Sequence, residues 1–221
     1  MTEDGVTSQV RATYDTVAED YAAHFPGTEL EAAIDLAAIG HFVTLLENRT
    51  RDVLDAGSGT GRMSRYLKDR GCHVRGVDLS PGMVVMARRD HPDIKTEVAS
   101  ITSLPFPDNS FDGLFYWYSI IHVPDDDLRA VFDEARRVLR PDGVVLVAFQ
   151  VGEGESEVGA GYRRLGHDVT LVRFHRTADQ VMRLLQTAGF LEAARMVRGP
   201  VGGEGHDQAV LIARLGGICE R

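Results

Sequence analysis

Hydrophobic positions recur along this chain with two different periods. In residues 6–25 they follow one another at intervals of three or four, which predicts a helix that carries Tyr14 and Tyr21 on one face. A second helix is predicted over residues 29–47. From residue 51 onward, short apolar runs alternate with helical segments, and this alternation is typical of a parallel sheet with right-handed helical crossovers.

The expected strands are apolar runs at 51–56, 72–77, 95–99, 111–117, 144–149, 190–197 and 208–215. Helices are expected at 61–70, 81–90, 125–139 and 177–187. Ser80 and Thr177 suit the N-caps of two of these helices. Residues 152–175 interrupt the rhythm, first with Gly and Glu and then with the alternating run GHDVTLVRFHR, so we interpret them as an insertion over the functional face of the sheet.

Composition and charge narrow the possible partners. The chain carries a formal net charge of -9, which works against a nucleic-acid binder because such proteins neutralise phosphates with Lys and Arg. No apolar run is long enough to span a bilayer, and the acidic start MTEDGVTSQV lacks an export signal, so we expect a cytoplasmic protein without a membrane partner. Cys72 and Cys219 lack metal or redox spacing and are interpreted as bystander thiols.

The segment VLDAGSGTGR, residues 53–62, ends the first predicted strand. Its glycines let the backbone approach a ligand closely, and the helix start that follows favours a carboxylate. Asp55 beside them would repel a pyrophosphate but suits an ammonium or sulfonium group. A dinucleotide fingerprint needs glycine where Arg62 stands, so nicotinamide binding is the weaker interpretation. Asp78, at the end of the next strand, can accept both hydroxyls of a ribose.

Four segments, VLDAGSGTGR, GVDLSPGMVVMAR, LPFPDNSFD and VLRPDGVVLVAF, together resemble the class I, Rossmann-like family of S-adenosylmethionine-dependent methyltransferases, in particular its small-molecule group called methyltransferase type 11. The resemblance covers about residues 8–215. It implies an α/β fold, a three-layer α/β/α sandwich with a seven-stranded, mostly parallel sheet whose last strand is antiparallel. It also implies S-adenosyl-L-methionine as the cofactor, S-adenosyl-L-homocysteine as its product, and no metal.

We expect residues 1–221 to form a single domain, because no linker, low-complexity tract or repeat divides them. Within that domain the resemblance implies a helical lid at 1–48, a cofactor-binding core at 49–150, an insertion lining the acceptor pocket at 151–176, and a C-terminal helix and strands at 177–221.

The family pattern implies cofactor contacts by position. It places the amino-acid end of the cofactor against Asp55 and the glycine loop, and the ribose against Asp78. The adenine edge would meet Ser100, which stands where many members carry an acidic residue. Tyr14 and Tyr21 match the family's lid, although both also fit the core of an amphipathic helix. The residues expected at the cofactor are Tyr14, Tyr21, Asp55, Gly57, Ser58, Gly59, Gly61, Asp78, Leu79, Met83, Ser100, Ile101 and Trp117.

The acceptor is expected just past the fourth strand, where WYSIIHVP begins. His122 in this segment is the first candidate for a catalytic base or a substrate contact, and the alternative is a histidine satisfied by a backbone carbonyl. Tyr118 fits either a wall or a contact. Candidates in the insertion are weighed against ordinary solvated residues; they are His167, Phe174, His175 and Arg176. The substrate-binding set is therefore Tyr118, His122, His167, Phe174 and His175, with His122 as the catalytic residue.

These expectations describe an enzyme that moves a methyl group to a small organic acceptor by in-line displacement. A carboxyl, phenol or amine would accept it, and both O- and N-methylation stay open, as do a monomer and a homodimer. The alternative is a non-catalytic protein that binds S-adenosylmethionine as a regulatory or partner subunit. None of the eight histidines pairs with a carboxylate at metal-ligand spacing, so we expect no metal.

Overall fold

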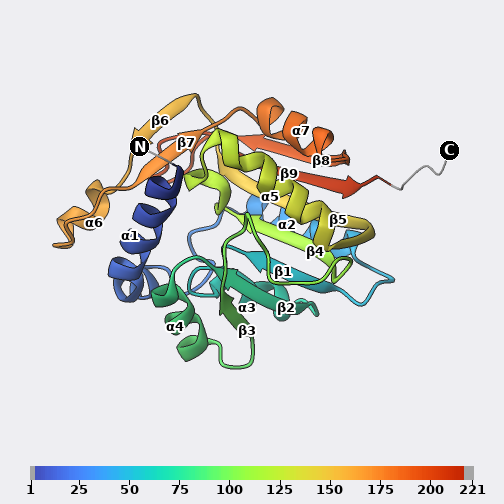
Figure 1. The fold of residues 1–221 in the computed structure, drawn as a ribbon, viewed down its shortest axis with the longest axis horizontal. Coiled ribbons are helices and arrows are strands. Elements are labelled where there is room, and N and C mark those ends of the chain that lie inside the picture. Colours follow the sequence, from blue (N-terminus) through green and yellow to red (C-terminus); the bar gives the residue numbers. More distant parts are fainter. Residues whose placement is uncertain (1–2, 217–221) are drawn as a thin grey trace.

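The computed structural model describes residues 3–216, and a sheet with helices on both faces forms the body of the protein (Figure 1). The helices are α1 (Glu3–His24), α2 (Ala33–Leu45), α3 (Arg62–Lys68), α4 (Pro81–Asp90), α5 (Asp125–Val138), α6 (Ala160–Arg164) and α7 (Ala178–Thr187), with a 3-10 turn η1 (Ile120–His122). The strands are β1 (Asp52–Ala56), β2 (His73–Asp78), β3 (Lys95–Val98), β4 (Phe111–Trp117), β5 (Leu139–Gln150), β6 (Gly154–Glu157), β7 (Val172–His175), β8 (Phe190–Arg198) and β9 (Gln208–Leu215).

The main sheet has the strand order β3-β2-β1-β4-β5-β9-β8. β1 to β5 pair in parallel, whereas β9 runs antiparallel to both of its neighbours, β5 and β8. The predicted α/β sandwich with an antiparallel last strand is therefore confirmed. The strand order reverses between β1 and β4, and at such a point the carboxyl ends of parallel strands border a crevice.

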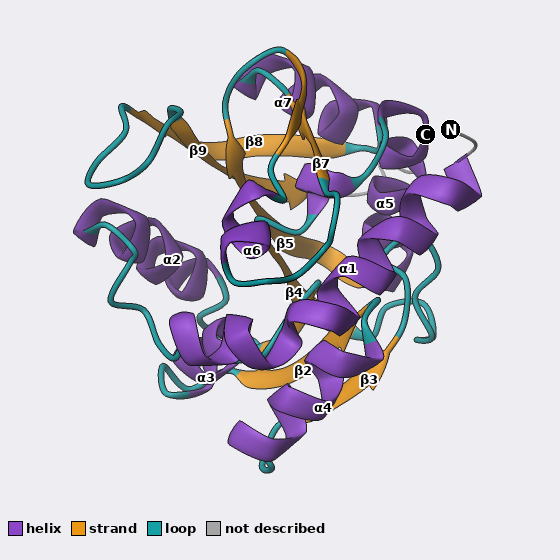
Figure 2. Cartoon of the chain, turned by 90° about the vertical axis from the view of Figure 1, so that its left-hand side faces the viewer, coloured by secondary structure: helices purple, strands orange, loops and turns teal. Residues whose placement is uncertain are grey.

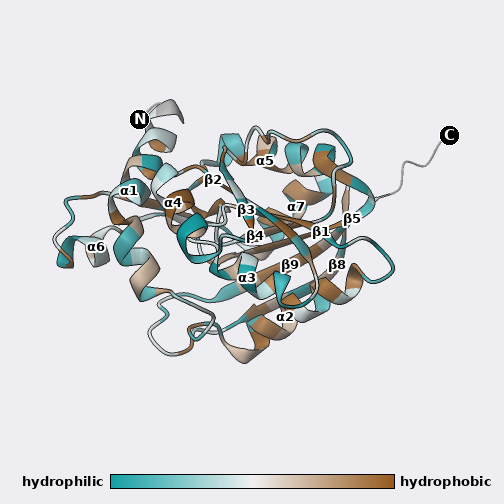
Figure 3. Cartoon of the chain, turned by 90° about the horizontal axis from the view of Figure 1, so that it is seen from below, coloured by the Kyte–Doolittle hydropathy of each residue, from teal (hydrophilic) through white to brown (hydrophobic). Residues whose placement is uncertain are grey.

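Two apolar cores fix the central strands from both sides. Phe42 of α2 and Leu67 of α3 pack with Phe115 on one face of the sheet. Phe132 of α5 and Leu185 of α7 pack with the other face. Every residue of β4 is buried, as expected for a strand covered on both faces, and Figure 3 shows the hydrophobic strands between the two helical layers. The carboxyl ends of these strands are therefore held rigidly.

Two predicted boundaries shift for identifiable reasons. The second helix begins at Ala33 rather than near residue 29, because the carboxylate of Glu31 pairs with Arg62 and the preceding residues remain an irregular loop. The next helix begins at Arg62, because Gly61 before it has a left-handed φ of 82°. The alternating run of the insertion forms a strand only at its end, as β7, which pairs antiparallel with β6.

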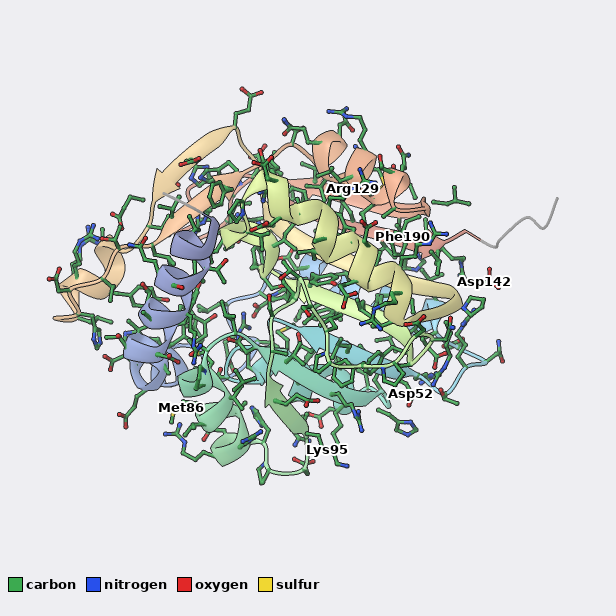
Figure 4. The ribbon with its side chains drawn as sticks, in the orientation of Figure 1. Asp52, Met86, Lys95, Arg129, Asp142 and Phe190 are labelled. Carbon is green, nitrogen blue, oxygen red and sulfur yellow. The ribbon has the colours of Figure 1, made fainter. Side chains whose placement is uncertain are left out.

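The first helix and the insertion lie together at the carboxyl ends of the strands. α1 packs along α4, and Figure 2 shows α1, α6 and β7 in front of the ends of β4 and β5. Figure 4 labels Asp52, at the start of β1, and Asp142 of β5, both on the side of the molecule away from α1. The helix and the insertion therefore cover the carboxyl ends of the strands.

Candidate functional site

A cavity of about 700 Å³ opens at the carboxyl ends of β1, β2 and β4, under α1 and the insertion. We call the part lined by Gly57, Gly59 and Asp78 the glycine end, and the part lined by His122 and Arg173 the histidine end. Small-molecule sites typically measure roughly 300–1,000 Å³, so this space suits a cofactor together with a small acceptor.

Most residues predicted from the sequence line this cavity. They are Tyr14, Tyr21, Gly57, Gly59, Asp78, Leu79, Met83, Ser100, Ile101, Trp117, Tyr118 and His122. Asp55 and Ser58 line a recess of about 40 Å³ that shares Gly57 and Gly59 with the cavity. Within the described chain, Gly61 lines neither space and instead forms the N-cap of α3.

The glycine loop leaves room where a side chain would intrude. Gly57 has a φ of 81°, and a Cβ there would lie 2.3 Å from the Cβ of Ser119. Gly59 also has a positive φ, of 53°, and a Cβ there would meet no atom within 4 Å, because it faces open space. The backbone amides of Gly57 and Ser58 both donate to the carbonyl oxygen of Val77, which ties the loop to β2.

The carboxylate of Asp78 is oriented by the backbone on both sides. One oxygen accepts a hydrogen bond of 2.8 Å from the Gly59 amide, and the other accepts one of 2.9 Å from the Ser80 amide. Burial raises the pKa of Asp78 to about 6, although these amide donors oppose the shift. Each carboxylate oxygen keeps acceptor capacity for a further donor.

Asp55 lies deeper, at the end of β1. Its side chain is buried and accepts a hydrogen bond of 2.6 Å from the hydroxyl of Ser64 in α3. Burial raises its pKa to about 7, with the nearby charge of Asp78 contributing in the same direction. A buried carboxylate with so few donors favours a cationic partner in the adjoining recess.

A polar cluster that we did not predict closes the recess on its outer side. Arg62 forms a salt bridge of 2.7 Å with Glu31 and donates to the carbonyl oxygen of Gly27. The indole of Trp117 donates to the same carboxylate at 3.2 Å. The sequence analysis used Arg62 only as evidence against a dinucleotide. Its position directly after the glycine loop was the signal that could have predicted its place beside the recess.

The other wall of the glycine end is mostly apolar. Leu79 and Met83 line it together with Ile101. The hydroxyl of Ser100 shares a hydrogen bond of 2.7 Å with the hydroxyl of Thr102 and accepts another from the Thr102 amide. Ser100, which stands where many members of the resembled family carry an acidic residue, therefore forms its hydrogen bonds within its own loop.

His122 uses both ring nitrogens. Nδ1 donates to the carbonyl oxygen of Val172 in β7 at 2.5 Å, because a carbonyl can only accept. Nε2 then accepts from the hydroxyl of Tyr14 at 2.9 Å. Burial lowers the pKa of His122 to about 4, and the nearby charge of Arg173 acts in the same direction, so the imidazole is neutral at neutral pH. The hydrogen bond to a backbone carbonyl, which the sequence analysis gave as the alternative for His122, is therefore present. A second hydrogen bond, to Tyr14, lies on the cavity side of the ring.

Side-chain contacts hold α1 over the cavity. The hydroxyl of Thr13 donates to the carbonyl oxygen of Thr170, and Asp20 pairs with His167 at 2.5 Å, which binds the helix to the insertion. On the opposite side, Asp15 accepts from the hydroxyl of Ser80 and from the Gly82 amide at the start of α4. The helix is therefore attached to both ends of the cavity.

The predicted acceptor residues of the insertion lie outside the cavity lining. His167 contacts α1 through Asp20, and His175 shares a hydrogen bond of 2.8 Å with the hydroxyl of Ser156. Phe174 lies 5.7 Å from the guanidinium of Arg176, which itself binds Asp125. These side chains support the insertion, and a direct role toward an acceptor stays a prediction.

The insertion nevertheless supplies cavity residues, and they differ from those predicted. Arg173 and Tyr162 line the cavity, as do Ser119, which lies beside Gly57, and Gln150 at the end of β5. In the run VRFHR, the alternation of a strand puts Arg173 on the opposite face from Val172 and Phe174. This alternation was the signal in the sequence that could have identified Arg173. Tyr118 lines the same cavity and donates to the side chain of Gln208 at 2.8 Å.

Among the described residues, no group of three or more His, Cys, Asp or Glu side chains is arranged to hold a metal ion. None of the helices in residues 3–216 is both long and apolar enough to span a bilayer. Cys72 is buried, and burial raises its pKa; Cys219 lies outside the described residues.

Comparisons with known proteins find a domain match for residues 53–143 and a shared fold for most of the chain. Residues 53–143 match the family described as a methyltransferase domain. The malonyl-[acyl-carrier protein] O-methyltransferase of Pseudescherichia vulneris is 34% identical over 136 residues, covering 62% of this chain and 51% of that protein. A crystal structure of Burkholderia thailandensis 1,6-didemethyltoxoflavin-N1-methyltransferase, with 1,6-didemethyltoxoflavin and S-adenosylhomocysteine bound, is similar with a TM-score of 0.73 at 20% identity, covering 98% of this chain and 91% of that one.

The likeness in fold extends to a protein named for another reaction. The [4+2]-cyclase SpnF has a TM-score of 0.67 at 20% identity, covering 95% of this chain and 97% of that one. The chain spans about half the length of the curated relatives it matches. The matched residues 53–143 contain the glycine loop, Asp78 and β4, the segments that carry the sequence resemblance. Residues 53–143 therefore match a methyltransferase domain, and the chain shares the Rossmann-like fold of solved S-adenosylmethionine-dependent methyltransferases.

Proposed function

We propose that this protein transfers the methyl group of S-adenosylmethionine to an oxygen or nitrogen atom of a small organic acceptor. One observation carries the proposal: the glycine end and the histidine end belong to a single cavity under one lid. A cofactor at the first and an acceptor at the second would share one enclosed space. Holding two reactants in attack geometry accounts for roughly 7–11 kcal/mol of barrier reduction in favourable cases.

The residues of the glycine end fit this cofactor. Gly59 leaves open space beside the loop, and Asp78 offers a carboxylate that can accept from two ribose hydroxyls. Leu79 and Met83 offer an apolar wall for a purine. Asp55 offers a negative charge toward an ammonium group in the recess. When bound, the cofactor supplies a methyl group that its sulfonium already activates for displacement.

We infer that His122 and Tyr14 together remove a proton from the acceptor. Because Nδ1 donates to Val172, the free lone pair of the neutral ring lies on Nε2, which faces Tyr14. We propose that the Tyr14 hydroxyl donates its own proton to Nε2 while the Tyr14 oxygen takes up the proton that leaves the acceptor. A base of this kind typically contributes about 10²- to 10⁴-fold. The relatives named as an O- and an N1-methyltransferase support both acceptor atoms equally.

The test separates binding from turnover. We expect S-adenosylhomocysteine to raise the melting temperature of the purified protein while NAD does not, because a ligand that binds only the native state stabilises it by mass action. S-adenosylmethionine incubated with fractions of a metabolite extract should then yield S-adenosylhomocysteine only with fractions that hold the acceptor. Binding without any acceptor-dependent product would identify a non-catalytic cofactor binder, or a cofactor-bound catalyst of another reaction, and would reject methyl transfer.

A further inference from the structure

The histidine end contains a cation without a partner. Arg173 lies in β7 and lines the cavity, and its Nε atom is buried with no hydrogen-bond partner in the described part of the chain. No salt bridge to Arg173 occurs among the described side chains, those of residues 5–216. A buried polar group that lacks a partner is costly, and a charged one more so.

Arg176, three residues further along, shows what a satisfied arginine looks like in the same segment. Its guanidinium pairs with Asp125 and donates to the carbonyl oxygens of Ile120 and Val123. Arg176 therefore binds the insertion to the start of α5, whereas Arg173 has no such structural task. The contrast indicates that the guanidinium of Arg173 is kept for a ligand.

The surroundings of Arg173 favour an anion. The titratable side chains near enough to affect its pKa are the tyrosines Tyr14, Tyr118 and Tyr162, and none of them is a carboxylate. His122 is neutral beside it. Hydroxyl groups can donate to an anion together with a guanidinium, and arginine is suited to carboxylates because its planar fork can donate two parallel hydrogen bonds.

We infer that Arg173 binds a carboxylate of the acceptor, so that the substrate of this protein is an organic acid. Identifying the bound anion as the methyl acceptor rests on the proposed function, but the anion site itself does not depend on methyl transfer. Arg173 would hold the carboxylate while another part of the same molecule faces Tyr14 and His122. Arg62, at the glycine end, is already paired with Glu31 and is not available for this task.

The experiment compares two fluorescent probes that share one ring skeleton. 8-Anilinonaphthalene-1-sulfonate carries an anionic group, and N-phenyl-1-naphthylamine lacks it. We expect Arg173→Met to weaken binding of the sulfonate about 10- to 100-fold, as loss of a charge-assisted hydrogen bond does, and to leave the uncharged probe within about twofold. Arg173→Lys should keep part of the preference because it keeps the charge. Arg164→Met is the matched control, since Arg164 lines the rim of the same cavity but is exposed.

Each result decides the inference. The inference is overturned if the wild type does not bind the sulfonate, if Arg173→Met changes both probes alike or neither, or if Arg164→Met has the same effect. A loss of S-adenosylhomocysteine affinity in Arg173→Met would also overturn it, because Arg173 would then belong to the cofactor. Both probes are measured without cofactor as well, so a protein that failed to bind S-adenosylhomocysteine would reject the proposed function and still report on the anion site.

Discussion

The two ends of the cavity are built by different means. At the glycine end, Gly59 in the loop after β1 and Asp78 at the end of the neighbouring parallel strand β2 are joined through a backbone amide. At the histidine end, Tyr14, His122 and Val172 come from three distant parts of the chain and meet through side-chain hydrogen bonds. The first end is fixed by the sheet, and the second exists only while α1 and the insertion are docked. The proposed cofactor site therefore depends on the sheet, and the proposed acceptor site depends on α1 and the insertion.

The largest effect is expected at the end that the sheet fixes. Asp78→Ala should weaken S-adenosylhomocysteine binding at least about 100-fold, because two hydrogen bonds to a charged group contribute about 1.5–3 kcal/mol each. Titration calorimetry measures the change. Since the pKa of Asp78 is raised to about 6, protonation below that pH removes the carboxylate, and wild-type affinity should fall as the pH drops from 7 to 5.

Asp78→Asn serves as the control for this pH dependence. It keeps one oxygen acceptor for the Gly59 amide but cannot titrate, so its weaker affinity should fall less than that of the wild type over the same range, and the fall that remains is expected from Asp55, whose pKa is raised to about 7. A wild-type affinity that does not change between pH 7 and pH 5 would contradict the assignment of Asp78 to the ribose.

The glycine end was predictable because its chemistry follows from local sequence. Asp55, Gly57, Gly59 and Asp78 lie at strand ends that the hydrophobic pattern locates, and parallel strands bring those ends together. The pattern does not contain the hydrogen bond from Ser64 to Asp55, which depends on how α3 packs. Sheet order and the antiparallel last strand required the family resemblance, because periodicity alone does not set which strands pair.

The second effect tests the histidine end through turnover. His122→Ala should lower turnover about 100-fold, the low end of what a general base contributes, and should change S-adenosylhomocysteine affinity less than threefold. The lowered pKa of about 4 means that the imidazole is already neutral above pH 5. The acid limb of the turnover profile assigned to His122 should therefore lie near pH 4–5 instead of near 6.5.

Tyr14→Phe is the companion variant, since it removes the hydroxyl that reaches Nε2 and keeps the ring. A loss of turnover similar to that of His122→Ala is expected if the proton passes through Tyr14. An equal loss of cofactor affinity in Asp78→Ala and His122→Ala would reject the separation of the two ends.

The histidine end was predictable only in part. His122 followed from its place after the fourth strand, but its partners Tyr14 and Val172 lie 108 and 50 residues away and become neighbours only when the insertion folds back. In the insertion, the sequence drew attention to His167 and His175 because histidine is chemically versatile. The structure places Arg173 at the cavity instead: strand alternation separates it from Phe174, whereas His175, on the same face of β7, shares a hydrogen bond with Ser156 outside the cavity lining.

A smaller effect is expected on stability. The pKa of Asp55 is raised to about 7 in the folded protein, compared with about 3.9 for an unfolded chain. The folded state therefore binds this proton more tightly, and the resulting stability is fully present below pH 4 and is lost as the pH rises through 7. Asp55→Asn cannot titrate, so it should be more stable than the wild type at pH 8 by roughly 2 kcal/mol without cofactor.

Urea unfolding at several pH values measures this difference in the free energy of unfolding between wild type and variant. The other titrating groups contribute equally to both proteins, so they cancel in the difference. The asparagine can still accept from Ser64, so the comparison isolates the charge. A difference that is constant from pH 4 to pH 8 would refute the raised pKa. If Asp55 holds the ammonium group, the same variant should also bind S-adenosylhomocysteine less tightly, by about tenfold.

The smallest effect concerns the helix that joins the two ends. Asp15 of α1 binds the start of α4 at the glycine end, and Asp20 binds His167 of the insertion at the histidine end. Both side chains are partly exposed, so each contact should contribute no more than about 1 kcal/mol. Asp15→Ala is therefore expected to weaken S-adenosylhomocysteine binding only about threefold to fivefold, and Asp20→Ala to leave it nearly unchanged.

The opposite order is expected for the anionic probe at the histidine end, where Asp20→Ala should weaken binding more than Asp15→Ala does. Each variant is the control for the other, because both remove one carboxylate from the same helix. If α1 instead moved as one rigid lid, loss of either contact would loosen both ends, and the two variants would weaken cofactor and probe alike. Equal losses would therefore show that the glycine end, like the histidine end, depends on the docked helix.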